Sequence, residues 1–359
     1  MTARPGLTTR GTVLLTTGII VLGGLTAVRL LNTTTPVVHE FSGATMGTSY
    51  TIKVWGPGLP PAAVAALIDS AVGRLEQVDR LMSPYDSTSE LSRFNMWQDT
   101  VPFALPPEVI EVLVAAQEVS NRTEGGFDVT VGPLVEAWGF GPGGRPATPP
   151  SNSVLERLSQ SVGYDLLQID AAAGTATKGH PELVVDLSDI AKGYAIDRVA
   201  GVLGAGGAAG FLVEIGGELR AHGVMPDSTP WRVTLERPEP GRRSIHQVIE
   251  LGEYAIATSG SYRNYYERDG QRYAHLLDPV TRRPVGYPGT AVSVVARTGM
   301  EADAWATALS VLGRERGFGL AQRDDVAALF VWQTEAGFNS QATDAFTRIV
   351  EVFPDGTTN

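Results

Sequence analysis

The sequence predicts an α+β protein of mixed sheets and packed helices, preceded by one N-terminal transmembrane helix. Segments with apolar residues at helical spacing are interspersed with strand-like segments, without the regular repeat of a parallel βαβ fold. Hydrophobic residues make up 43% of the 359 residues and charged residues 19%, which is enough for a sizeable core. A long uncharged run lies close to the N-terminus.

The first element is this uncharged run, at residues 11–28. As a helix it would extend about 27 Å, close to the thickness of a bilayer core. Arg4 and Arg10 precede it, which places the N-terminus in the cytoplasm and the remainder outside. A cleaved signal peptide is the alternative, although the run is long for one and lacks a clear cleavage site. We therefore expect a cytoplasmic tip, anchor and linker at 1–36, and one extracytoplasmic domain at 37–359, held at the cell membrane.

Helices and strands then follow in mixed order. The run 60–82 repeats apolar residues every three to four positions, which predicts an amphipathic helix. The stretch 49–55 alternates in character, which predicts a strand, and the Gly- and Pro-rich stretch 139–150 predicts a loop. By these criteria helices are expected at 60–82, 107–121, 190–203 and 302–312, and strands at 49–55, 182–187, 210–223 (turning at Gly216-Gly217), 231–237, 246–250, 254–258, 291–296 and 327–332.

The composition excludes several classes of function. The chain has no cysteine, which rules out disulfides, thiolate metal sites and thiol nucleophiles. Its net charge of -11 argues against a nucleic-acid partner, which requires a basic surface. The same acidity means that a polyphosphate ligand needs a local cation to offset repulsion.

Asp303 and Thr307 stand four residues apart in the predicted helix 302–312. Their oxygens therefore lie on one face of the helix, a turn apart. A carboxylate and a hydroxyl are hard-oxygen ligands suited to Mg2+. Taken alone, the pattern is more typical of an Asp that favours the helix dipole and a Thr that bonds back to its own helix.

The segment VDLSDIAKGYAID (185–197) runs from an apolar stretch into a helix. Lys192, near the start of that helix, could meet a phosphate together with backbone amides. The alternative is a cap formed by Ser188 or Asp189 beside a solvated lysine.

Three other segments place polar residues at turns. EGGFDVTVGPL (124–134) carries paired glycines, which let a ligand approach the backbone, and an Asp among apolar residues, which needs partners. ATSGSYR (257–263) and YAHLLDPVT (273–281) are strands that run into polar turns. Ordinary structural turns are the alternative for all three.

Together and in their order, eight motifs resemble the ApbE family of FAD:protein FMN transferases. The resemblance covers roughly residues 40–335. The motifs are TMGTSY (45–50), LMSPYDSTSELSRFN (81–95), GGFDVTVGPLVEAWGFG (125–141), VDLSDIAKGYAIDR (185–198), EIGGEL (214–219), ATSGSYRN (257–264), HLLDPVT (275–281) and EADAWATAL (301–309).

The resemblance implies roles for particular residues. The FAD contacts that it implies are Met46, Tyr85, Gly126, Phe127, Asp128, Asp186, Lys192 and Leu277. The Mg2+ ligands that it implies are the side chains of Asp303 and Thr307, the backbone of Ala306, and Asp189 by its side chain or carbonyl. Asp303 would act in catalysis through the metal. His275, or an acidic residue near the metal, is the candidate to accept the proton of the attacking hydroxyl, because the unperturbed pKa of His suits that role.

The chain also departs from the family pattern. Asp189 is acidic where the family often has Ala, Ser or Thr, and Arg282 stands where Gly usually follows the Asp-Pro turn. Many family members are anchored through a lipidated cysteine, which this chain lacks, so we expect the apolar N-terminal helix to anchor it.

The activity implied by the resemblance is Mg2+-dependent transfer of FMN from FAD to a Thr or Ser hydroxyl of an acceptor protein, through a phosphoester bond, with release of AMP. The acceptor would be a flavinylated component of a membrane redox system or another envelope reductase. Two alternatives remain open: an FAD pyrophosphatase that releases FMN and AMP, and a membrane-tethered FAD-binding protein without catalysis.

Overall fold

The computed structural model describes residues 37–286 and 289–353. The described residues from Val38 to Phe353 form one compact unit. The predicted membrane anchor at 11–28 lies outside the described residues. Within the described part, no helix has both the length and the apolar character needed to cross a bilayer.

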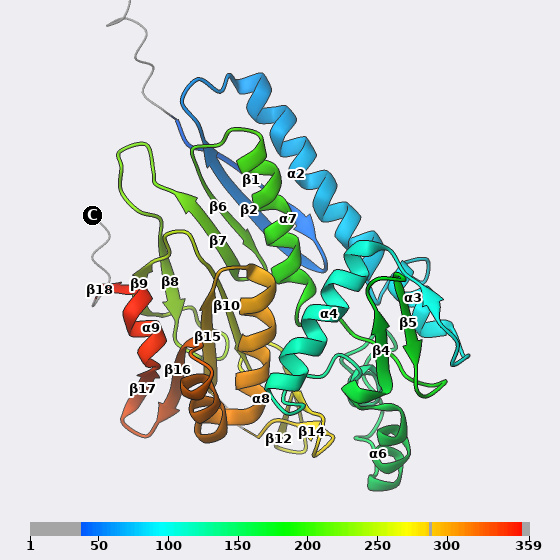
Figure 1. Cartoon of the computed structure of the whole chain (residues 1–359). Helices are drawn as coiled ribbons and strands as arrows, with labels where there is room; N and C mark the ends of the chain where they lie inside the picture. Colours follow the sequence, from blue (N-terminus) through cyan, green and yellow to red (C-terminus); the bar gives the residue numbers. More distant parts are fainter. Residues whose placement is uncertain (1–36, 287–288, 354–359) are drawn as a thin grey trace, which may run out of the picture. The chain divides into compact units, whose positions relative to one another are not determined.

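The centre of the fold is an eight-stranded sheet in which every neighbouring pair is antiparallel (Figure 1). The turn between its first two strands has positive φ at both Met46 (49°) and Gly47 (71°), as a two-residue hairpin of type I′ requires. In spatial order the strands are β1 (His39–Thr45), β2 (Thr48–Trp55), β6 (Gly210–Ile215), β7 (Glu218–Gly223), β10 (Ala255–Gly260), β15 (Thr290–Ala296), β16 (Ala327–Thr334) and β17 (Gly337–Ala342).

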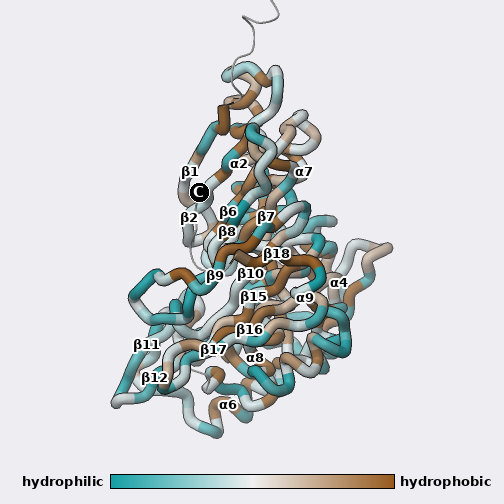
Figure 2. Tube along the Cα trace, turned by 90° about the vertical axis from the view of Figure 1, so that its left-hand side faces the viewer, coloured by the Kyte–Doolittle hydropathy of each residue, from teal (hydrophilic) through white to brown (hydrophobic). Residues whose placement is uncertain are grey.

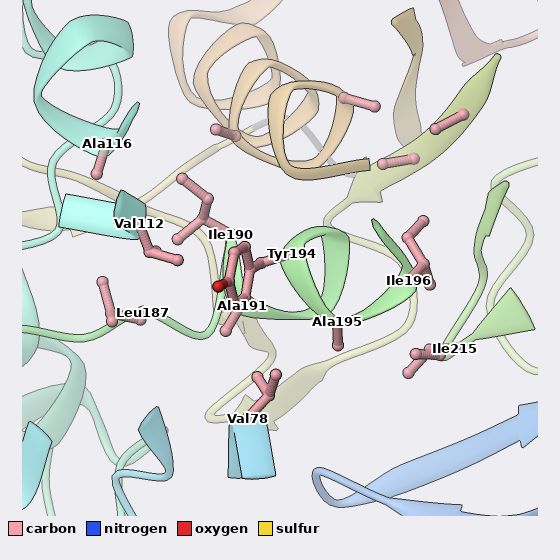
Figure 3. Packing of buried hydrophobic residues seen from close by; sticks show 14 of the residues in the cluster. Val78, Val112, Ala116, Leu187, Ile190, Ala191, Tyr194, Ala195, Ile196 and Ile215 are labelled. Carbon is pink, nitrogen blue, oxygen red and sulfur yellow. The ribbon is translucent and has the colours of Figure 1, made fainter. Parts of the chain in front are cut away.

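Long helices cover one face of this sheet (Figure 1). They are α2 (Pro61–Met82), α4 (Pro107–Arg122), α7 (Ala191–Ala205) and α8 (Gly299–Arg323). Their apolar stripes bury a single large core against the sheet, in which Tyr194 and Ile196 of α7 lie near Val78, Val112 and Ile215 (Figure 3). This core fixes α7 and α8 relative to the sheet.

A smaller sheet covers part of the opposite face (Figure 2). It contains β8 (Arg232–Glu236), β9 (Ile245–Glu250) and β18 (Glu351–Phe353), and α9 (Asp344–Ile349) packs beside it. Alternation along β8 sends Val233 and Leu235 into a second core with Ile256 of β10, while Arg232 and Thr234 stay exposed.

Shorter elements complete the unit. A third core is made by Leu134, Trp138, Leu155 and Leu277. These elements are α3 (Glu90–Met96), α5 (Gly132–Trp138), α6 (Asn152–Leu158), β3 (Phe103–Ala104), β4 (Leu167–Asp170), β5 (Thr175–Lys178), β11 (Tyr265–Arg268), β12 (Gln271–Ala274), β13 (Leu277–Asp278), β14 (Arg283–Pro284) and two 3-10 turns, Ser159–Ser161 and Tyr164–Leu166.

The mixture of helices and strands is as predicted, and the four predicted helices are present. The strand expected at 182–187 is wrong. Within this segment only Val184 forms a β-bridge, to Val131. The Asn95 side chain hydrogen-bonds to both the amide and the carbonyl of Val185, each at 2.8 Å, so these two groups do not pair with a neighbouring strand. The helix expected at 302–312 is longer: it turns at Gly313, where φ is 75°, and continues to Arg323.

Candidate active site

Polar residues from the loop at 126–128, the segment before α7, the β12–β13 region and α8 converge around a small hollow of about 30 Å³. Eight of the site residues predicted from the sequence line it. Those that line the hollow are Gly126, Phe127, Asp128, Asp186, Asp189, His275, Leu277 and Thr307.

Helices α7 and α8 touch backbone to backbone beside this hollow. A Cβ on Gly193 would lie 2.2 Å from the carbonyl oxygen of Gly299, and a Cβ on Gly299 would lie 2.4 Å from the Ile196 side chain. Only glycine at both positions permits this approach. As a result the Gly193 amide donates a hydrogen bond to Oδ2 of the buried Asp303, at 3.0 Å.

Asp197 holds the beginning of α8 against α7. Its carboxylate accepts hydrogen bonds from the amides of Gly299 (2.8 Å) and Met300 (3.0 Å), which have no partner within their own helix. The guanidinium of Arg220 also pairs with it. Burial raises the pKa of Asp197, and these donors oppose that rise. Asp197 thus helps to place Asp303 one turn further along.

Lys192 lies at the centre of a cluster of acidic side chains. Its Nζ donates to the carbonyl of Ser188 (2.9 Å) and lies 3.3 Å from Oε1 of Glu218 and 3.8 Å from Oδ2 of Asp303. Burial opposes the ammonium charge, but Asp303, Glu218 and Asp189 outweigh it and hold the pKa of Lys192 above its ordinary value.

The acidic side chains around Lys192 exceed the positive charge available to them. Burial raises the pKa of Asp303 and of Glu218, and the Lys192 ammonium opposes both shifts. Glu218 Oε2 is buried without a hydrogen-bond partner among the described residues. The single ammonium of Lys192 therefore faces three carboxyl groups, those of Asp303, Glu218 and Asp189. This excess of negative charge favours the binding of a further cation or of a proton.

Two side chains in the hollow carry oxygen atoms of the kind that bind metal ions. Neither the Asp189 carboxylate nor the Thr307 hydroxyl hydrogen-bonds to another residue within the described part of the chain. Burial raises the pKa of Asp189 to about 6, with Lys192 opposing the shift. No group of three or more His, Cys, Asp or Glu side chains in the described ranges forms a metal cluster. The protein thus offers a few hard oxygens, which fits Mg2+, since Mg2+ usually retains waters and substrate phosphates as ligands.

His275 faces the hollow in its neutral form. Its Nδ1 lies 3.0 Å from the carbonyl oxygen of Asn264, so that nitrogen carries the proton and Nε2 keeps its lone pair. Burial lowers the pKa of His275 to about 4, with the Lys192 charge adding to the shift. The unperturbed pKa expected from the sequence is therefore wrong, because the imidazole is desolvated and lies near a cation.

Asp128 and Asp186 shape two adjacent turns. Oδ1 of Asp128 accepts from the amide and hydroxyl of Thr130, both at 2.7 Å. Oδ1 of Asp186 accepts from the amide (2.9 Å) and hydroxyl (2.6 Å) of Ser188. Their backbones meet where the Asp186 amide donates to Val129, at 2.7 Å. Both carboxylates are thereby fixed at the wall of the hollow.

Gly126 and Arg282 occupy positions where backbone conformation and space matter. A Cβ on Gly126 would lie 2.7 Å from the Leu312 side chain, so glycine is needed for the loop to pack on α8. Arg282 adopts φ of 62°, the left-handed region that glycine populates without strain. Its carbonyl accepts a hydrogen bond from Trp138 Nε1 at 2.9 Å, which ties the turn to the third core.

Five predicted site residues do not line the hollow. Lys192 and Asp303 lie beside it, in the charged cluster. Met46 lies in the β1–β2 turn and packs on the first core, and Tyr85 is 69% exposed with its hydroxyl 3.4 Å from the Phe140 carbonyl. Ala306 is fully buried within α8, where carbonyls accept from amides four residues on, so it is the least available of the predicted ligands.

Glu218 and Asp197 were not predicted as site residues. Each lies within a motif used for the resemblance, EIGGEL and VDLSDIAKGYAIDR. The signal in the sequence that points to either residue is an acidic side chain inside such a motif. Their partners, however, lie far away in the sequence: Lys192 for Glu218, and Gly299 for Asp197.

The chain is similar to proteins of one family over most of its length. The model of the ApbE family matches residues 46–330. A Vibrio cholerae protein named FAD:protein FMN transferase is 43% identical over 311 residues, covering 86% of this chain and 91% of that protein. A Haemophilus influenzae protein of the same name is 38% identical over 318 residues, covering 88% and 92%.

Solved structures give the same result. The flavin transferase ApbE from Vibrio cholerae superimposes with a TM-score of 0.80 at 41% identity, covering 87% of this chain and 99% of that one. The apo form of the Pseudomonas stutzeri flavinyl transferase ApbE gives a TM-score of 0.79 at 39% identity, covering 87% and 96%.

Proposed function

Because the chain belongs to the ApbE family, we propose that it is an FAD:protein FMN transferase that moves FMN from FAD to a Thr or Ser hydroxyl of an acceptor protein and releases AMP. One observation supports this above all: unengaged oxygens of Asp189 and Thr307 share a hollow with His275, next to the cluster of Lys192 and Asp303. That combination suits a diphosphate and the hydroxyl that attacks it.

The proposed reaction is a phosphoryl transfer. The acceptor oxygen forms a bond to the FMN-side phosphorus, and the bond from that phosphorus to the bridging oxygen breaks. AMP leaves with the bridging oxygen, and the hydroxyl proton passes to a base. Such reactions depend mainly on positioning and on neutralising charge.

The residues present fit a Mg2+ ion. Asp189, Asp303 and Thr307 would hold it, and Ala306 would contribute only if its carbonyl were shared with the helix. When bound, the ion would neutralise the diphosphate and stabilise the charge that develops on it. The excess of carboxyls around Lys192 gives this cation an electrostatic reason to bind.

The side chains of the chain have distinct proposed tasks. His275 is neutral, and its Nε2 is the proposed acceptor of the hydroxyl proton. Lys192 supplies a fixed positive charge beside the metal ligands. The tight contact of Gly193 with Gly299 keeps Asp303 in place, so that little reorganisation is needed during the reaction.

We also propose that the domain acts outside the cytoplasm, anchored by residues 11–28, on a component of a membrane redox system. The arginines before the apolar run support this orientation. Protease added to cells stripped of any outer barrier should digest the part after Asn32. Full protection of that part would contradict the orientation.

Mass spectrometry tests the reaction directly. The chain is mixed with FAD, Mg2+ and the soluble domain of a candidate acceptor from the same cell envelope. The acceptor should gain the mass of FMN minus water, and AMP should appear in equal amount. A parallel incubation without acceptor separates the alternatives: rapid release of FMN and AMP would indicate a pyrophosphatase, and FAD binding without turnover in either incubation would indicate a binding protein.

A further inference from the structure

We propose that the open edge of β8 binds an extended segment of the acceptor protein, which pairs with β8 as a fourth strand of the small sheet. This inference rests on the proposed function, since it concerns how the acceptor reaches the site. It adds a docking surface on the face of the main sheet opposite to α7 and α8.

Strand β8 is the end strand of its sheet, whose order is β18-β9-β8. The amide of Leu251 donates to the carbonyl of Trp231 at 3.1 Å, and these residues continue the register that pairs Arg232 with Glu250. Hydrogen-bonded pairs alternate along an antiparallel ladder, so Val233 bonds to β9, whereas the backbone groups of its two neighbours point away.

The two neighbours of Val233 therefore carry the free edge. The outward backbone groups of Arg232 and Thr234 have no backbone partner among the described residues. A register shift between Leu235 and Glu236 ends the regular pairing. Free edges of this kind are the sites where peptides add to sheets.

A groove of about 470 Å³ runs along this edge. Every residue of β8 lines one side of it, and Thr51 of β2 with Leu212 and Glu214 of β6 lines the other. The small sheet covers only part of the main sheet (Figure 2). An added strand would lie over β6 and β2, where Leu212 is apolar and Thr51 and Glu214 are polar.

Two residues that line the groove directly precede residues that contact the proposed active site. Arg263 lines the groove, and the carbonyl of the next residue, Asn264, accepts the backbone amide of His275 at 3.0 Å and lies 3.0 Å from its Nδ1. Gly217 also lines it and directly precedes Glu218, the partner of Lys192. A strand in the groove would thus lie against segments that continue directly into residues of the proposed site.

The charges of the groove indicate the chemistry of the segment. Three arginines and two glutamates line it, in a chain whose net charge is -11. Arg243 and Arg263 both pair with Glu236, so two guanidinium groups share one carboxylate at the C-terminal end of β8. We therefore expect an extended acceptor segment that carries an acidic side chain close to its flavinylated hydroxyl.

The test uses Thr234→Pro, with Thr234→Ala as its matched control. Proline removes the outward amide at an edge position without removing a bond to β9, whereas alanine keeps that amide and removes the exposed side chain. The probe is the acceptor domain that gains an FMN mass in the experiment above. We expect Thr234→Pro to raise the KM for this domain about tenfold, with Thr234→Ala near wild type. FAD affinity and thermal unfolding should be unchanged in both variants.

Three outcomes would overturn the proposal. The first is an unchanged KM for Thr234→Pro that folds as wild type. The second is an equal rise in KM for both variants, which would assign the effect to the side chain. The third is a change in oligomeric state caused by Thr234→Pro, which would mean that a second copy of the chain occupies the edge. A wild-type chain that transfers no FMN would instead refute the proposed function.

Discussion

Replacing Gly193 by alanine tests the close contact of α7 and α8 that places Asp303. The new methyl group would lie 2.2 Å from the Gly299 carbonyl oxygen and 2.8 Å from Cβ of Asp303, whereas ordinary contact begins at 3.4 Å. The Gly299 oxygen is a backbone atom and cannot rotate away. The two helices must therefore separate by about 1 Å, because the core around them is close-packed.

This separation should weaken both the fold and the site. Overpacking of a core contact costs about 1–3 kcal/mol of the free energy of unfolding. The hydrogen bond from the Gly193 amide to Asp303, now 3.0 Å, would stretch toward the limit at which such bonds persist. A displacement of about 1 Å at a reacting group can slow a reaction about 100-fold. We expect Gly193→Ala to lose stability within that range and to transfer FMN about 100-fold more slowly.

Urea unfolding and the rate of FMN transfer, followed by mass spectrometry, measure the two effects. Gly201→Ala is the matched control, since Gly201 lies on the same helix and a Cβ there meets nothing within 4 Å. Alanine at that position should raise the free energy of unfolding by about 0.5–1 kcal/mol and leave transfer unchanged. Gly193→Ala that matched wild type in both stability and transfer would refute the reasoning.

The remaining predictions concern charge. Asp303→Asn keeps an oxygen to accept from Gly193 but loses the negative charge, so the protein should stay folded while FMN transfer falls about 100-fold or more, as measured with Mg2+ in excess. Asp197→Ala leaves Arg220 and two helix amides without their partner, so urea unfolding should show a loss of about 3 kcal/mol. Lys178 is buried, and burial lowers its pKa from 10.5 to about 8. Between these values the unfolded chain binds more protons than the folded protein, so wild-type stability should rise with pH relative to Lys178→Met from about pH 8 to 10.5.

Each of these predictions has a result that contradicts it. Normal transfer by Asp303→Asn at any Mg2+ concentration would remove Asp303 from the metal site. Asp69→Ala, a change at an exposed position on α2, should leave stability within about 0.5 kcal/mol of wild type, and Asp197→Ala should not resemble it. A difference in stability between wild type and Lys178→Met that stayed constant with pH would mean that Lys178 titrates normally in the folded protein.

The sequence predicted most of the long elements because their signals are local. Apolar residues repeat at helical spacing along α2 and α4, and in the structure the predicted face of α4 is buried while that of α2 is buried in part, with Ile68, Leu75 and Val78 in the core. The extended segment at 182–187 has the apolar character of a strand, and the sequence could not show that the Asn95 side chain would take the backbone groups of Val185. Short pairs such as β13 with β14 were missed, because two-residue strands carry no periodicity.

The candidate site was likewise predicted only in part from the sequence. The sequence placed Asp303 and Thr307 on one helical face and singled out the segments that carry Asp128, Asp186 and His275, and the structure brings all of these segments to one hollow and its edge. Their individual roles as ligands of FAD or Mg2+ remain predictions.

By itself, then, the sequence determined the class of fold, the family, and the segments that bear the chemistry, because contiguous residues encode periodicity and motifs. Only the tertiary structure decided that Glu218 and Asp303 would share Lys192, that Asp197 would cap α8, and that burial would keep His275 neutral. These properties arise from residues far apart in the chain, and a side chain acquires its charge state and its partners only when packing removes it from water.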